Sequence, residues 1–177
     1  MLNPGLKPCQ GGFTLIELMI GIVILAILVS LSMPSFQVWL QNSQIRNAAE
    51  SISNGLQRAR SEAVTRNIDV EFVLSGNSSW VVKVAGLADD IESRSNTEGS
   101  RNVSVTITPN GLDTITYNGF GGVKTLNLDS SMPFTQIDVD SSVLSSAESQ
   151  ELRVTIGTGG NIRMCDPNAP AGNPRAC

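Results

Sequence analysis

The sequence contains no histidine, and it has only three cysteines and one tyrosine among 177 residues. Without an imidazole the chain cannot form a Ser-His-Asp or Cys-His relay. It also lacks the one side chain whose unperturbed pKa lies near neutrality. Paired carboxylates and Ser/Lys arrangements remain available in principle, but no other feature of the sequence calls for them. The composition therefore predicts a protein that is not an enzyme and that carries no cofactor.

Charge is also scarce, because only 16% of the residues are charged and the net charge is -4. Proteins that coat nucleic acid need a positive stripe to displace counterions from phosphates, and an acidic chain does not favour that role. The length predicts one domain with additional terminal segments. Hydrophobic residues make up 41% of the chain, which is enough for a core, but they are unevenly spread.

A single apolar run covers residues 13–33, and its only charge is Glu17. At 1.5 Å per residue this run forms about 31 Å of helix, which matches the hydrocarbon core of a bilayer. The twelve residues before it are polar or helix-breaking and carry one positive charge, Lys7. The sequence therefore predicts a membrane-spanning helix that begins at or after Gly12.

Three interpretations of this N-terminus differ in which segment is cleaved from the mature protein. A secretory signal peptide cut near residues 30–32, which read Ser-Leu-Ser, would release a soluble domain. A lipoprotein signal at Cys9 fails, because no apolar run precedes that cysteine. The third interpretation removes only the leader, residues 1–12, and keeps the helix.

Residues 12–18 read GFTLIEL and resemble the type IV prepilin motif. The resemblance implies that a prepilin peptidase cuts between Gly12 and Phe13 and methylates the new amine of Phe13. It also assigns Glu17, the fifth mature residue, to subunit assembly. An ionisable group inside a membrane span is costly and is read by default as functional. The alternative is a glutamate that is favoured only by the dipole of the first helical turn.

The pattern changes from uniformly apolar to amphipathic after Pro34. Many pilins carry a proline at this position, and its missing donor predicts a kink or a locally melted turn there. Beyond it, apolar residues recur at steps of three and four, which predicts one helix over about 13–65 with residues 34–66 as its amphipathic half. A coiled coil formed through the same apolar face is the less favoured interpretation. The face consists of Ile45, Ala49, Ile52, Leu56, Ala59 and Ala63.

Oppositely charged residues four positions apart support this helix on its outer surface. The two pairs are Arg46 with Glu50 and Arg58 with Glu62.

From Asp69 onward the apolar residues recur with a period of two or form short β-rich runs, which predicts a β-rich domain over residues 67–177. Its polar stretch at residues 88–101 is typical of a surface loop. One long helix packed on an antiparallel β-sheet or sandwich is an α+β fold. The predicted strands cover residues 70–74, 80–84, 103–108, 114–117, 123–128, 136–139, 151–156 and 161–165.

Residues 46–50 (RNAAE), 56–63 (LQRARSEA) and 114–119 (TITYNG) resemble the GspH/FimT family of minor pilins and pseudopilins. The C-terminal RMCDP and PRAC are more similar to the FimT/FimU branch. The resemblance implies a type IV pilin-like fold and a non-catalytic minor pilin that takes part in pilus assembly or priming. Its partners would be other minor and major pilins, prepilin peptidase and the inner membrane. The chain would cross that membrane once, with its C-terminal domain in the periplasm, and would enter a surface pilus.

Two alternatives come with the same resemblance. One is a pseudopilin of a type II secretion system. The other is a DNA-binding competence pilin, because some FimT-like proteins bind DNA through a Gly-Arg-x-Arg loop. Here that stretch reads Gly-Asn-Ile-Arg over residues 160–163, so only Arg163 remains, with Arg153 and Arg175 as candidate neighbours. Three cations form a small electrostatic footprint, and DNA binding is not favoured.

The cysteines fit an exported protein. Cys9 would leave with the leader, and Cys165 and Cys177 can then pair in an oxidising periplasm. Such a bridge resembles the C-terminal disulfide loop of many pilins. Two thiolates without histidine do not complete a structural metal site.

Two further patterns are weak. Residues 119–125 read GFGGVKT, but Val123 stands where a phosphate-binding loop requires glycine directly before lysine. Asp138 and Asp140 would share one face of a strand and could bind calcium with a third ligand. A solvated acidic edge is the favoured interpretation of this pair.

Overall fold

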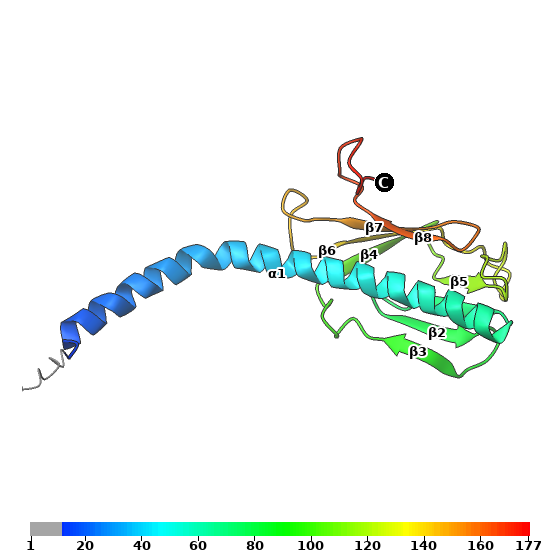
Figure 1. The fold of residues 1–177 in the computed structure, drawn as a ribbon, viewed down its shortest axis with the longest axis horizontal. Coiled ribbons are helices and arrows are strands. Elements are labelled where there is room, and N and C mark those ends of the chain that lie inside the picture. The colour runs from blue at the N-terminus through cyan, green and yellow to red at the C-terminus, as the bar shows by residue number, and fades with distance from the viewer. Residues whose placement is uncertain (1–11) are drawn as a thin grey trace, which may run out of the picture. The chain divides into compact units, whose positions relative to one another are not determined.

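A computed structural model describes residues 12–177 (Figure 1). The leader predicted over residues 1–12, apart from Gly12, lies outside the described residues, as does Cys9. The described chain contains one long helix, α1 (Leu15–Arg66), followed by eight strands. It forms two compact units, of which the first ends at Gln37 and the second comprises Val38–Cys177.

Helix α1 is continuous, and Pro34 lies inside it. The structure therefore shows no melted turn at Pro34, and the kink at that position stays a prediction. The helix ends at Arg66 because Asn67 adopts a left-handed conformation, with φ of 52°. Ile68 N then donates to Ala63 O and Asn67 N donates to Val64 O, which is a Schellman cap.

The strands form two antiparallel four-stranded sheets. Sheet A has the order β3-β2-β1-β5, and sheet B has the order β4-β6-β7-β8. The β1–β2 connection is a tight turn with positive φ at Gly76 and Asn77. Sheet A contains β1 (Val70–Leu74), β2 (Trp80–Val84), β3 (Asp90–Arg94) and β5 (Thr114–Tyr117). Sheet B contains β4 (Val103–Thr108), β6 (Gln136–Ser141), β7 (Leu152–Ile156) and β8 (Ile162–Cys165).

Two of the expected elements were wrong. The polar stretch expected to be a surface loop contains β3, which lies at the edge of sheet A and pairs only with β2. Because its side chains are largely exposed, it carries no alternating apolar pattern. Residues 123–128 form no strand beyond one bridge between Val123 and Tyr117. Leu126 and Leu128 in this segment remain exposed.

The second half of α1 lies along both sheets and forms the core with them (Figure 1). All six apolar residues that the sequence places on the inner face are buried. Ala48, Ser51 and Gly55 are buried beside them. A Cβ on Gly55 would lie 2.8 Å from Phe72 and 2.9 Å from Trp80, so glycine allows the helix to approach sheet A closely. The largest buried sheet residues include Phe72, Tyr117, Ile115, Ile137 and Val139.

Candidate assembly sites

The first unit presents an apolar surface that the described chain does not cover. Within residues 12–177, α1 is the helix that is long and apolar enough to cross a membrane. No residue of its most apolar stretch is buried. Lipid or other helices must cover these side chains, since water does not stabilise so large an apolar surface. The exposed residues are Phe13, Leu15, Ile16, Leu18, Met19, Ile20, Ile22, Val23, Ile24, Leu25, Ile27, Leu28, Val29, Leu31 and Met33.

Gly12 and Phe13 precede this helix, and the Phe13 side chain is 84% exposed. The next residue, Thr14, caps the helix: Glu17 N donates to Thr14 Oγ1 at 3.3 Å, and Thr14 N donates to Glu17 Oε2 at 3.5 Å. This is a capping box, in which two backbone N–H groups are satisfied reciprocally. Glu17 therefore closes a capping box, a more specific local role than the helix-dipole effect considered from the sequence, although the T-x-x-E spacing signals it.

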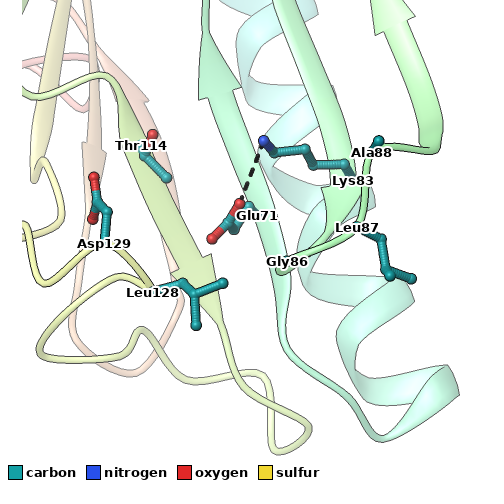
Figure 2. Close-up of a pocket in the computed structure, with 8 residues that line it drawn as sticks. All are labelled: Glu71, Lys83, Gly86, Leu87, Ala88, Thr114, Leu128 and Asp129. Carbon is teal, nitrogen blue, oxygen red and sulfur yellow. Dashed lines mark ion pairs between the residues drawn. The ribbon is translucent and has the colours of Figure 1, made fainter.

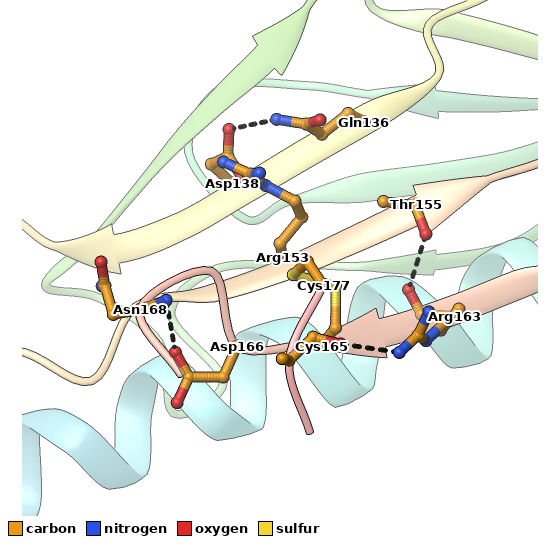
Figure 3. Close-up of a disulfide and its surroundings, with 10 residues drawn as sticks. Gln136, Asp138, Arg153, Thr155, Arg163, Cys165, Asp166, Asn168 and Cys177 are labelled. Carbon is orange, nitrogen blue, oxygen red and sulfur yellow. Dashed lines mark hydrogen bonds and ion pairs between the residues drawn. A yellow bond between two sulfur atoms is a disulfide. The ribbon is translucent and has the colours of Figure 1, made fainter. Parts of the chain in front are cut away.

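The structure joins Cys165 to Cys177 by a disulfide, with Cα atoms 5.1 Å apart, as the family resemblance implies (Figure 3). The bridge holds the C-terminal tail against β8. Asp166 N donates to Arg175 O at 2.7 Å, and Asp166 forms a parallel bridge with Ala176. The tail therefore meets the chain directly after β8, the outer strand of sheet B.

Two of the three candidate DNA-binding arginines share one face of sheet B (Figure 3). Arg153 pairs with Asp138, whose Oδ1 is 2.5 Å from Arg153 Nε. Arg163 donates to Ala176 O at 2.7 Å, and Arg175 belongs to the tail. Because Asp138 neutralises Arg153, the three arginines do not form the strong positive patch that phosphate binding requires.

The two aspartates considered for calcium lie on β6, and both are engaged in other contacts. Asp138 accepts from Gln136 in addition to pairing with Arg153. Asp140 accepts from Ser141 N and from the Ser149 hydroxyl. In the described range 12–177 no cluster of three acidic, cysteine or histidine residues is placed to hold a metal ion.

The glycine-rich segment 119–125 forms no phosphate cradle, because its backbone donors are already used. Phe120 N and Gly122 N both donate to Asn118 Oδ1, and Val123 N donates to Thr158 O. Lys124 pairs with Asp69 at 2.6 Å. The weak nucleotide-loop pattern is therefore explained by a tightly bonded turn.

Arg60 links this turn to the β7–β8 hairpin, a contact that sequence reasoning missed. Its Nε donates to Gly121 O at 3.0 Å and its Nη2 to Gly159 O at 3.4 Å. Arg60 forms none of the ion pairs found among residues 12–177. Its partners are backbone carbonyl oxygens of distant segments, which the pattern of opposite charges along the helix does not reveal.

A groove of about 570 Å³ lies on sheet A, between the segment that follows β2 and the one that follows β5 (Figure 2). Glu71, only 7% exposed, and Lys83 lie in it with Nζ 3.7 Å from the carboxylate. Leu87 and Leu128 line its sides. At its rim, hydrogen bonds from Ser131 lower the pKa of Asp129 below its ordinary value. The groove contains one ion pair between apolar walls, an arrangement that favours packing against another surface over catalysis.

A motif-bearing apolar helix that continues into an amphipathic half packed on two antiparallel sheets defines a pilin-like subunit. A model of the prokaryotic N-terminal methylation motif matches residues 7–33. A model of the type II transport protein GspH matches residues 48–175, which is most of the chain. The chain therefore belongs to the GspH family, and the resemblance stated from the sequence is confirmed.

Two solved proteins share the fold. The type IV minor pilin FimU of Pseudomonas aeruginosa matches with a TM-score of 0.54 and 15% identity, over 75% of this chain and 97% of FimU. The minor pseudopilin EpsH of the Vibrio cholerae type 2 secretion system matches with a TM-score of 0.50 and 13% identity, over 71% of this chain and 99% of EpsH. The predicted pilin-like α+β fold is confirmed. The family consists of structural subunits of pilus and pseudopilus filaments.

Proposed function

We propose that the chain is a non-catalytic minor pilin that initiates or caps a type IV pilus. The first half of α1 would anchor it in the inner membrane, with residues 67–177 in the periplasm, until it joins other minor pilins and the major pilin. The observation that carries this proposal is the uncovered apolar surface of residues 13–33, which bears one ionisable group, Glu17. Neighbouring pilin helices would cover that surface after assembly.

The expected role of Glu17 is to pair with the free amine of Phe13 on a neighbouring subunit, since pairing relieves two charges in an apolar environment. The capping box provides a way to separate this role from the local one. Glutamine can replace glutamate in a capping box, whereas alanine cannot. Glu17→Gln therefore keeps the cap and removes the charge, and Glu17→Ala removes both.

Both variants should be inserted and processed normally but enter filaments poorly. The measurement is the fraction of the chain recovered with sheared filaments, compared with the fraction left in the membrane. If Glu17→Gln enters filaments as well as the native chain while Glu17→Ala does not, the cap is the important interaction and the charge pair is dispensable.

Processing tests the membrane topology that the proposal needs. Intact-mass measurement of the membrane-derived chain should show that residues 1–12 are lost and that the amine of Phe13 is methylated. A mature chain that begins near Met33 would be a secreted domain, and the filament proposal would then be wrong.

Deletion of the protein tests the initiating role. A filament whose subunits stack head to tail needs a distinct subunit to define its end. The number of surface pili should fall while the major pilin is still made and processed. Loss of protein secretion with normal pili would instead assign the chain to a type II secretion system. Loss of DNA uptake alone would favour a competence pilin.

A further inference from the structure

Sheet A ends at β3 and β5, and sheet B ends at β4 and β8. An edge strand exposes backbone N–H and C=O groups on one side, and native proteins cover such edges or place charges on them. Three of these edges are protected in one of these two ways. The fourth, β4, is not.

Each protected edge has its own means. Strand β3 carries Asp90, Glu92 and Arg94. Strand β5 is covered by the segment that follows it, where Lys124 N donates to Thr116 O at 2.9 Å. Strand β8 carries the charge of Arg163, and the disulfide-linked tail meets the chain directly after it, at the bridge between Asp166 and Ala176.

Strand β4 reads VSVTIT and carries no charge. The nearest charged residues in the sequence are Arg101 and Asp113, on either side of the strand. β-Branched residues dominate it, which favours extended pairing. A six-residue edge with high β-propensity and no charge is the kind that recruits another strand.

The hydrogen-bond register shows which groups of β4 face outward. Ser142 N donates to Asn102 O at one end of the β4–β6 pair, and Ile156 N donates to Thr135 O at the adjoining end of the β6–β7 pair. Residue pairs in an antiparallel ladder alternate between hydrogen-bonded and non-hydrogen-bonded pairs. In the observed registers, both contacts therefore indicate that Ser104, Thr106 and Thr108 are the β4 residues that are hydrogen-bonded to β6.

The N–H and C=O groups of Val105 and Ile107 therefore point away from β6. In the described part of the chain, no backbone hydrogen bond from outside the ladder reaches them. Val103 N is already used, because it donates to Ser100 O at 3.3 Å. The outward groups repeat about every 7 Å along the strand, which is the spacing that another extended backbone presents.

We propose that β4 accepts an extended, uncharged strand from a neighbouring pilin-family subunit, which becomes a fifth strand of sheet B. This inference rests on the proposed filament role. Backbone pairing would supply affinity, and the exposed side chain of Thr106 would contact the side chains of the added strand.

The pattern of edges indicates a different subunit and not a second copy of this chain. Among the described strand edges, a second copy could offer only its own β4, because the other three are covered or charged. Two β4 edges would pair through a two-fold axis, and such a contact closes on itself and does not propagate along a filament. A partner subunit with its own uncharged edge or extended segment has no such restriction.

Hydrogen exchange tests the open edge directly. In the full-length chain in detergent micelles, the amides of Val105 and Ile107 should exchange at least about tenfold faster than those of Ser104 and Thr106. Uniform protection of all four amides in the isolated chain would show that the edge is already covered, and the proposal would be wrong.

A matched pair of charge substitutions tests the occupant. Thr106→Lys adds a charge to the exposed face of β4, and Ser93→Lys adds the same charge to an exposed position on the β3 edge. Thr106→Lys should reduce recovery of the chain with pilin-family subunits by at least about tenfold. Ser93→Lys should leave recovery unchanged, and both variants should keep the native circular dichroism spectrum.

Photo-crosslinking from position 106 in cells identifies the partner. A crosslink to an extended segment of another pilin-family subunit supports the proposal, whereas a crosslink to a second copy or to a helix overturns it. If the native chain joins pilin complexes and Thr106→Lys joins them equally well, this inference fails and the filament role stands. If the native chain joins no pilin complex, the filament role itself fails.

Discussion

The apolar surfaces of the two halves of α1 differ in what can cover them. The first half carries large side chains such as Leu25 and Ile24, all exposed, and Glu17 is its only charge. The second half buries mainly small residues, including Ala49, Gly55 and Ala59, against two sheets. Small residues let a helix approach its own sheets closely, whereas large uncovered ones require a partner outside the chain. One helix thus combines an intramolecular packing surface with an intermolecular one.

This comparison makes opposite predictions for the same substitution in the two halves. Leu56→Ala removes a fully buried side chain and should lower the free energy of unfolding by about 2–5 kcal/mol. Leu25→Ala removes an exposed side chain and should leave unfolding of the second unit unchanged. Urea titration of the full-length chain in micelles, followed by circular dichroism, measures both. Equal destabilisation by the two substitutions would show that the first half also packs within its own chain.

The packed half was predictable because its pattern is regular. The spacing of Ile45, Ile52 and Leu56 identifies the inner face, and the pairs Arg46 with Glu50 and Arg58 with Glu62 form at 3.0 Å as the sequence predicts. The role of Gly55 was not visible, because its importance depends on Phe72 and Trp80, which come from distant strands.

The strands show where sequence reasoning fails. β3 was missed because an exposed edge strand needs no alternating apolar residues. The short β-rich run over residues 123–128 predicted a strand, but the side chain of Asn127 makes the hydrogen bonds there. Its side chain donates to Thr114 O and accepts from the Thr116 hydroxyl, which holds the segment in an irregular path.

The candidate site residues also differ in how far the sequence predicts them. Phe13, Glu17 and the cysteines belong to local sequence motifs, and the capping box of Thr14 and Glu17 follows from the spacing of these two residues. The partners of Arg153 and Arg163 could not be predicted, because Asp138 and Ala176 reach them only through the sheet register and the folded tail.

The C-terminal tail is the part of the second unit that is held by a disulfide bond. Replacing Cys165 and Cys177 by serine should lower the free energy of unfolding by at most about 3 kcal/mol, the chain-entropy value for so short a loop. Denaturant titration of the oxidised native chain and the double variant gives this difference. Thiol titration of the folded native chain without residues 1–12 should find no free thiol. Two reactive thiols there would contradict the bridge.

Glycine-to-alanine substitutions also compare the two halves of α1, with a smaller expected effect on stability. Alanine in an exposed helix interior is favoured over glycine by about 1 kcal/mol, so Gly21→Ala should be neutral or slightly stabilising. Gly55→Ala should instead destabilise the chain by about 1–3 kcal/mol, because its Cβ would clash with the rings of Phe72 and Trp80. Thermal unfolding of the two variants in the same detergent compares them directly. If Gly55→Ala matched Gly21→Ala, the close approach of α1 to sheet A would be absent.

The smallest expected effect concerns Tyr117, the only tyrosine, whose side chain is fully buried in sheet A. Its hydroxyl has no hydrogen-bond partner within the described structure. Because burying an unpaired hydroxyl is costly, Tyr117→Phe should be neutral or stabilise the chain by up to about 1 kcal/mol at neutral pH. Burial raises the pKa of Tyr117, and the nearby Arg60 charge opposes this shift only in part.

The raised pKa determines how stability depends on pH. Above about pH 10 the unfolded chain loses the tyrosine proton while the folded chain keeps it, so the unfolded state binds fewer protons. The free energy of unfolding of the native chain should therefore fall by up to about 1.4 kcal/mol per pH unit in this range from Tyr117 alone. Tyr117→Phe should lack this component, which urea titrations of both chains at several alkaline pH values would measure. Tyrosinate absorbance reports on this one residue, and its appearance near pH 10 in the folded chain would show that Tyr117 is not buried.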